Sequence, residues 1–258
     1  MTHKQRVHAA LARKPVDRVP VFMWFHPLTA EKLAAALEIP VSKVGEAMGD
    51  DVIQAWVGNN FAMEGVVHEK EGGSHVDQWG IEWVREGLFN QICRSPLENV
   101  GDSEIADYEF PSEHIPQLVR SMDRIACVYG EYFIGSDVSP CVFEMLNRLR
   151  GMENCLIDLA AKSEPFLALL KKAGDFSCAL SEMACSSYKL DWLWTGDDVG
   201  GQQSMMMSPE CWRELVKPQL ARVVMVGKKH GLWVAYHSCG SIRPIIPDLI
   251  EIGIDVLN

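Results

Sequence analysis

Short runs of apolar residues alternate with longer amphipathic stretches along most of the chain. Six runs have the length and the bulky side chains of buried strands, and they cover residues 19–25, 51–57, 132–136, 191–195, 232–236 and 254–258. Helical periodicity predicts helices at about residues 3–13, 30–38, 43–48, 114–128, 141–150, 152–161, 164–188, 208–230 and 241–251. Apolar strands that alternate with helices in this way are typical of a parallel α/β sheet.

One part of the chain departs from this pattern. Residues 64–88 contain two alternating segments, 66–70 and 81–86, around Gly72 and Gly73. This arrangement predicts an antiparallel hairpin. Residues 90–112 are polar and rich in turn-forming residues, which predicts a loop. We therefore expect a single domain over residues 1–258 with a hairpin inserted at about residues 64–88.

Polar side chains gather directly after the predicted strands: His26, Asp137, Asp197, Asp198, His237 and Cys239. In a (β/α)8 barrel the carboxyl ends of the strands carry the chemistry. A doubly wound sheet is the competing architecture, but no glycine-rich phosphate turn follows the first predicted strand. The barrel prediction has one difficulty. A closed barrel needs eight strands, and only six are predicted, so an incomplete barrel would expose two strand edges.

Composition narrows the functional classes. The chain is 48% hydrophobic and 23% charged, which is ordinary for a globular protein, and its net charge is −11. An acidic chain without a basic stripe is not expected to bind nucleic acid or an anionic membrane. We find no signal-peptide core and no apolar run that would span a bilayer. Eight cysteines are scattered without a paired framework, which indicates a cytoplasmic protein with reduced thiols.

His237 and Cys239 are the residues with the clearest chemistry. They lie two positions apart at the end of a predicted strand, so their side chains point the same way. An imidazole nitrogen and a soft sulfur on one face suit zinc, although zinc in proteins usually takes three or four side-chain ligands. The alternative is a core cysteine beside a surface histidine.

Four other positions are candidates for substrate contacts, and one is a candidate acid or base. Asp197 and Asp198 are adjacent and face opposite sides, and we expect Asp197 to point inward as the catalytic hydrogen-bond acceptor or general base. Asp198, Gln202, His26 and Asp137 are the candidate substrate-binding residues. Each also has a structural interpretation, because aspartates can fix a turn through side-chain hydrogen bonds and residues at strand ends can be satisfied locally.

Several short motifs together resemble the uroporphyrinogen decarboxylase-like superfamily. They are residues 17–21 (DRVPV), 79–80 (WG), 149–154 (LRGMEN), 196–200 (GDDVG), 208–210 (SPE), 237–240 (HSCG) and 249–258 (LIEIGIDVLN). Each motif is weak alone, but their order and spacing match over essentially the whole chain. Members of this superfamily are (β/α)8 barrels that are longer than this chain and continue past Asn258 into two more strands.

The resemblance favours one of two branches. Uroporphyrinogen decarboxylases carry an arginine-bearing segment near the first strand that binds the acidic side chains of the porphyrinogen, and residues 21–27 here hold no arginine. The other branch comprises corrinoid-dependent methyltransferases and O-demethylases. There the His-x-Cys motif supplies two zinc ligands, and the third is a cysteine beyond the end of this chain.

The resemblance implies a zinc-dependent transfer of a methyl group between a small substrate and a corrinoid protein. The small substrate is a methoxy or other methylated compound, or a thiol. The expected cofactors are zinc, held by His237 and Cys239, and a corrinoid carried by the partner protein. Two alternatives stay open: a decarboxylase-like lyase of tetrapyrrole biosynthesis, and a non-catalytic barrel fragment. An unclosed sheet would also favour a homodimer.

Overall fold

The computed structural model describes residues 1–58, 68 and 70–258, and it contains two sheets. The larger is a five-stranded parallel sheet of order β1-β5-β6-β7-β8. Its strands are β1 (Val52–Trp56), β5 (Phe133–Asp137), β6 (Trp192–Gly196), β7 (Trp233–His237) and β8 (Val256–Leu257). The smaller is antiparallel, of order β2 (Ser74–Val76), β3 (Glu82–Glu86) and β4 (Phe89–Arg94). The expected α/β class with a parallel sheet is confirmed.

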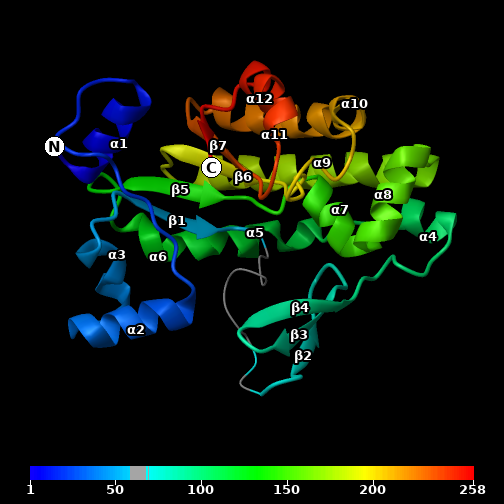
Figure 1. Cartoon of the computed structure of the whole chain (residues 1–258), viewed down its shortest axis with the longest axis horizontal. Helices are drawn as coiled ribbons and strands as arrows, with labels where there is room; N and C mark the ends of the chain where they lie inside the picture. The colour runs from blue at the N-terminus through cyan, green and yellow to red at the C-terminus, as the bar shows by residue number, and fades with distance from the viewer. Residues whose placement is uncertain (59–67, 69) are drawn as a thin grey trace.

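Helices connect the parallel strands and cover one face of the sheet (Figure 1). The α-helices are α1 (His3–Leu11), α2 (Pro27–Leu37), α3 (Val44–Ala47), α4 (Asp102–Asp107), α5 (Ile115–Leu118), α6 (Asp123–Ala126), α7 (Phe143–Arg150), α8 (Met152–Ala161), α9 (Glu164–Ser187), α10 (Pro209–Cys211), α11 (Lys217–Lys229) and α12 (Ile246–Ile252). A π-helical stretch, Trp212–Val216, joins α10 to α11 just before Pro218, whose ring nitrogen has no hydrogen to donate. Within the described residues, no helix is both long and apolar enough to cross a membrane.

Residues 19–25 do not form the first strand that their apolar character predicts. The backbone N–H groups of Val21 and Met23 donate to the carboxylates of Asp51 and Asp50, at 2.8 and 3.0 Å. Because these groups bond to side chains rather than to a neighbouring strand, no ladder forms, and the prediction of six parallel strands is wrong by one. The segment still lies along the sheet, since Asp51 N–H donates to the Val21 carbonyl at 2.7 Å.

The inserted hairpin is larger than the sequence predicts. Residues 81–86 form β3 as expected, but β3 pairs on both sides, with β2 and with β4. The polar composition of residues 90–112 hides β4, because a strand of a small surface sheet needs no apolar run. The other predicted strand, residues 66–70, falls mostly outside the described residues.

Side chains of the parallel strands alternate between two faces. On the helix-covered face, Ile134, Leu193 and Val234 belong to the main core with residues of α9 and α11. On the other face, Phe133 and Trp192 form a second, smaller cluster with α1. A cavity of about 880 Å³ lies along this second face, and its lining includes residues at the carboxyl ends of β5, β6 and β7 as well as residues before β1 and β5.

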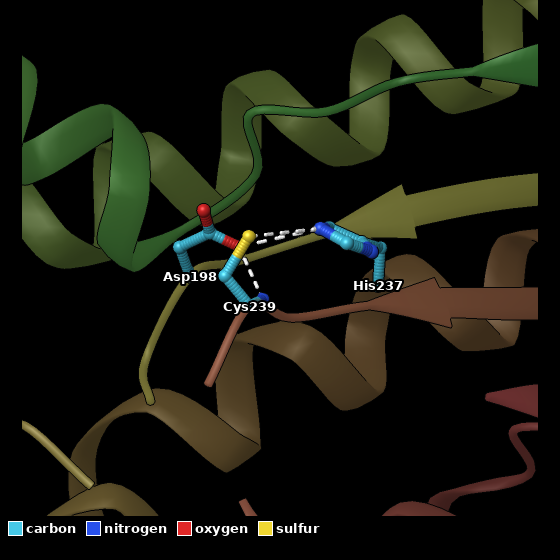
Figure 2. A group of neighbouring side chains, drawn as sticks. All are labelled: Asp198, His237 and Cys239. Carbon is cyan, nitrogen blue, oxygen red and sulfur yellow. Dashed lines mark hydrogen bonds and ion pairs between the residues drawn. The ribbon is translucent and has the colours of Figure 1, made fainter. Parts of the chain in front are cut away.

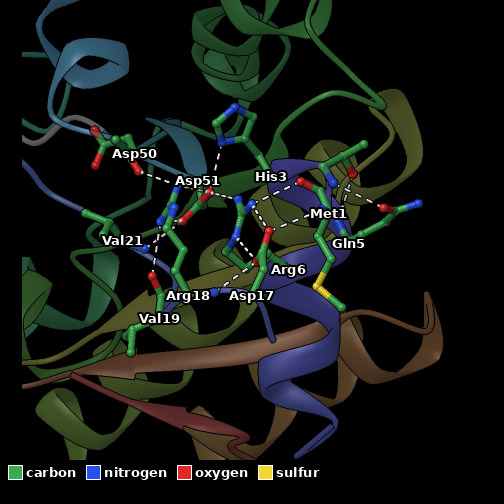
Figure 3. A network of polar contacts seen from close by, with 12 residues as sticks. Met1, His3, Gln5, Arg6, Asp17, Arg18, Val19, Val21, Asp50 and Asp51 are labelled. Atoms are coloured by element: carbon green, nitrogen blue, oxygen red, sulfur yellow. Dashed lines mark hydrogen bonds and ion pairs between the residues drawn. The ribbon is translucent and has the colours of Figure 1, made fainter. Parts of the chain in front are cut away.

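A network of ion pairs closes the opposite, amino-terminal end of the sheet (Figure 3). The buried carboxylate of Asp51 accepts hydrogen bonds from Arg6 at 2.6 Å and from Arg18 at 2.7 and 2.8 Å, and it lies 2.8 Å from the His3 ring. Arg6 also pairs with Asp17 at 2.6 Å. The DRVPV motif thus ties α1 and the segment after it to the start of β1.

Candidate metal centre

Three potential metal ligands meet at the carboxyl ends of β6 and β7, where they line the cavity (Figure 2). His237 is the last residue of β7, Cys239 follows two positions later, and Asp198 follows β6. The two loops can approach closely because both carry glycines. A side chain at Gly240, whose φ is +78°, would place its Cβ 2.4 Å from the Gly200 carbonyl oxygen, so only glycine fits there.

The three side chains face one another. Cys239 Sγ lies 3.4 Å from His237 Nε2, and that nitrogen lies 3.6 Å from Asp198 Oδ1. Asp198 Oδ1 also accepts a hydrogen bond from the Cys239 backbone N–H at 2.7 Å. One ligand atom from each residue therefore falls within 4.8 Å of the others.

Asn258 orients the histidine. Its Oδ1 lies 2.7 Å from His237 Nδ1, so it accepts a hydrogen bond when that nitrogen carries the proton. This bond favours the tautomer whose Nε2 holds a free lone pair directed at Cys239 and Asp198. Metal-binding histidines are commonly fixed in this way by an acceptor on the other ring nitrogen.

The geometry fits a zinc ion. Zinc bonds of about 2.3 Å to sulfur and about 2.0 Å to nitrogen, at a tetrahedral angle, place the two ligand atoms about 3.5 Å apart. The 3.4 Å between Cys239 Sγ and His237 Nε2 agrees with this spacing. Burial raises the pKa of the Cys239 thiol to about 11, and the nearby Asp198 carboxylate adds to the effect. A bound metal ion would lower the pKa of this thiol, because the metal binds the thiolate form.

Asp137 is the other sequence-predicted residue that lines the cavity. It ends β5 and is 2% exposed. It accepts hydrogen bonds from the Ser139 N–H at 2.9 Å, from the Ser139 hydroxyl, and from Gln54 Nε2 at 3.1 Å. Burial nevertheless raises the pKa of Asp137 to about 7.

The two adjacent aspartates are oriented in the opposite way to our expectation. Asp198 lines the cavity, whereas Asp197 is completely buried on the helix-covered side. The Asp197 carboxylate accepts hydrogen bonds from the backbone N–H groups of Val142 and Glu144, at 3.2 and 2.9 Å, at the start of α7. The prediction that Asp197 points inward is therefore wrong. Its parity along β6 matches that of Leu193 and Thr195, which face the helices.

His26 and Gln202 also lie apart from the cavity lining. His26 caps α2, since its Nδ1 accepts from the Leu28 N–H at 3.3 Å, and its Nε2 lies 3.0 Å from the Leu88 carbonyl at the β3–β4 turn. Gln202 is exposed on the loop after β6. Neither side chain belongs to the group formed by Asp198, His237 and Cys239.

Sequence reasoning missed several residues of the cavity. Glu144 and Arg148 of α7 form an ion pair at 2.5 Å within the lining, and Arg148 also lies over the Trp83 ring of β3, 5.6 Å from its centre. Trp24 and Trp56 line the same cavity. The two tryptophans lie within apolar runs that look like ordinary core sequence, so no local signal distinguishes them.

Comparison with known proteins supports the fold class. No family model and no curated protein matches the sequence. Among solved structures, the chain is similar to a methyltransferase from Methanosarcina mazei, with a TM-score of 0.73 and 17% sequence identity. The similarity covers 100% of this chain and 75% of the other. This protein therefore has the α/β fold of an archaeal methyltransferase.

Proposed function

We propose that this protein is a zinc-dependent methyltransferase that moves a methyl group between a small substrate and a corrinoid carried by a partner protein. The observation that carries the proposal is the convergence of Asp198, His237 and Cys239 at the wall of the large cavity. The resemblance in fold to a methyltransferase supports it, as do the motifs shared with the uroporphyrinogen decarboxylase-like superfamily. In this proposal the five-stranded sheet is part of a (β/α)8 barrel of that superfamily.

Each residue of the site has a distinct task in the proposed reaction. His237 Nε2, Cys239 Sγ and an Asp198 oxygen would hold the zinc, and Asn258 keeps the imidazole in the correct tautomer. Bound zinc supplies a Lewis acid with an open coordination position, which activates a substrate thiol or a methoxy oxygen. Cys239 would lose its thiol proton when it binds the metal. Trp24, Trp56 and Trp194 line the same cavity and would contact the substrate.

The decarboxylase alternative is less consistent with the cavity. A porphyrinogen with several acidic side chains needs cationic partners. Phe22, Met23 and Trp24 line the cavity in the segment where decarboxylases carry arginine. The lining also holds more acidic than basic residues, which would repel such a substrate.

Metal content tests the proposal most directly. We expect the purified chain to hold about one zinc ion per molecule. We expect Cys239→Ala and His237→Ala each to lose it, and Asn258→Ala to bind zinc about 10–100-fold more weakly. Cys93→Ala is the matched control, because Cys93 is an exposed thiol of β4 away from the cavity. Elemental analysis and competition with a chromophoric chelator provide the readouts.

Activity is then measured with free methylcobalamin in place of the corrinoid protein. Loss of its methyl group to a small thiol, followed by absorbance, is expected for the zinc-loaded chain and not for Cys239→Ala. A chain that binds no zinc after loading would contradict the proposal. Equal zinc content in Cys239→Ala and the unmodified chain would contradict the ligand assignment.

A further inference from the structure

Two tryptophans form an aromatic corner in the wall of the cavity. Trp24 comes from the segment before α2, and Trp56 is the last residue of β1. Their ring centres are 5.8 Å apart and their planes meet at 78°, so the two indoles stand as perpendicular walls. Both side chains line the cavity.

The corner lies at a distance from the metal ligands. In the sheet order, β1 is three positions from β7, the strand that carries His237. At roughly 4.8 Å per strand, the corner and the metal centre are separated by roughly 14 Å along the sheet. A substrate that contacts both the candidate metal centre and the corner must therefore span a distance of that order.

A carboxylate stands beside the corner but has little hydrogen-bonding capacity left. Asp137 pairs directly with Trp56 in the register of β1 and β5. Its oxygens accept from the Ser139 N–H, the Ser139 hydroxyl and Gln54 Nε2. A carboxylate offers about four acceptor positions. Asp137 thus has at most about one acceptor position left for a ligand, and a cation beside it would favour its ionised form.

The cavity as a whole has an excess of negative charge. The acidic residues in its lining are Glu46, Asp50, Glu131, Asp137, Glu144 and Asp198. Two of them are paired with the basic residues of the lining, Glu46 with Lys43 at 2.6 Å and Glu144 with Arg148 at 2.5 Å. Burial raises the pKa of Asp137 to about 7 and that of Asp50, which precedes β1, to about 6. A cation bound beside Asp137 would lower the pKa of that carboxyl group.

We propose that the cavity binds a substrate carrying a methylated ammonium group, which sits in the corner of Trp24 and Trp56 beside Asp137. Indole faces attract a cation that lies within about 6 Å of the ring centre, and pairs of aromatic walls are suited to quaternary ammonium groups. Binding of the ammonium group in the corner does not depend on the proposed methyltransferase function. Only the placement of the opposite end of the substrate at the candidate metal centre rests on that function.

Methylation is inferred from the hydrogen bonding at Asp137. A primary ammonium group has three N–H donors and needs three acceptors to replace its water. The corner supplies two apolar ring faces and a carboxylate with three of its about four acceptor positions occupied. A quaternary ammonium group needs charge and apolar contact but no acceptors, so it matches what the corner offers.

The test compares two probes of the same shape, choline and its uncharged carbon analogue 3,3-dimethylbutan-1-ol. Binding is measured by calorimetry on the zinc-loaded chain and again after removal of the metal by a chelator. We expect choline to bind at least about tenfold more tightly than the neutral analogue in both states. Trp56→Leu and Trp24→Leu should each weaken choline binding roughly tenfold and leave the neutral analogue nearly unchanged.

Phe89→Leu is the matched control, because Phe89 is an exposed aromatic residue outside the cavity lining. It should bind choline like the unmodified chain. Equal binding of the two probes, or no binding of choline to a folded chain, would overturn the inference. These outcomes are distinguishable from failure of the proposed function, which is tested by zinc content and by loss of zinc in Cys239→Ala.

Discussion

Asp137 is a carboxyl group whose ionisation is coupled to folding. Burial raises the pKa of its side chain to about 7, compared with about 3.9 in an unfolded chain. Between these two pH values the folded protein keeps a proton that the unfolded chain releases. The contribution of Asp137 to the free energy of unfolding therefore falls as the pH rises from about 4 to about 7, and it is constant above that.

This coupling gives a prediction for Asp137→Asn, which cannot ionise. Its free energy of unfolding should depend less on pH between 5 and 7, with a slope smaller by up to about 1.4 kcal/mol per pH unit, the value for one proton. Urea unfolding at pH 5, 6 and 8 measures the slopes. Glu38→Gln, which removes an exposed charge, is the control. An unchanged slope in Asp137→Asn would show that Asp137 already ionises near its ordinary pKa.

At the scale of elements, α7 depends on the end of β6. Asp197 accepts the N–H groups of Val142 and Glu144 at the first turn of the helix, as a capping residue does. The next residue, Asp198, contacts the loop after β7 instead. Two adjacent aspartates thus serve different parts of the structure: Asp197 caps a helix of the covered face, and Asp198 belongs to the candidate metal centre.

Substitution of Asp197 and of Asp198 should affect different properties of the protein. Asp197→Ala should lower the free energy of unfolding by roughly 1–2 kcal/mol, because a helix cap is lost, while zinc still binds. Asp198→Ala should change stability little in the metal-free chain and should weaken zinc binding. Chemical unfolding of the metal-free chains and zinc titration measure the two effects. The reverse pattern would assign Asp197, rather than Asp198, to the metal centre.

Sequence patterns predicted most elements of the sheet but not how they pair. The runs that became β5, β6 and β7 are apolar on both faces, so their burial is visible locally. Residues 19–25 have the same character, but their N–H groups bond to Asp50 and Asp51 across about 30 residues of chain. Strand β4 was missed for the opposite reason, because it forms on a surface sheet with polar residues.

At the scale of the whole molecule, the ion-pair network around Asp51 joins distant parts of the chain. It links α1, the DRVPV segment and β1 through contacts between residues up to 48 positions apart. Burial alone would raise the pKa of Asp51, but hydrogen bonds from the Val21 N–H, His3, Arg18 and Arg6 outweigh it and lower the pKa. The stabilisation is fully present above the unfolded pKa of about 3.9, and it is lost as the pH falls through the lower folded value.

Removal of the Asp51 charge should therefore destabilise the whole fold. Asp51→Asn leaves the buried Arg6 with Asp17 as its remaining ion-pair partner, and the lost charge-assisted hydrogen bonds cost roughly 1.5–3 kcal/mol. Thermal and urea unfolding at pH 7 measure the loss, and the difference from the unmodified chain should shrink as the pH approaches 3. The exposed pair of Lys43 and Glu46 is the comparison, since Glu46→Gln should destabilise the fold much less. A loss as small as that for Asp51→Asn would show that the network adds little.

The sequence by itself determined the class of the fold and two of the three candidate metal ligands. Apolar runs and helical periodicity are local properties, and so is the two-residue spacing that points His237 and Cys239 to one side. Tertiary structure decided which aspartate joins them, because inward and outward faces are defined only when β6 packs between β5 and β7. It also decided that Trp24, Trp56 and Asn258 belong to the site, since each arrives there on a separate element and none has a local pattern that marks it.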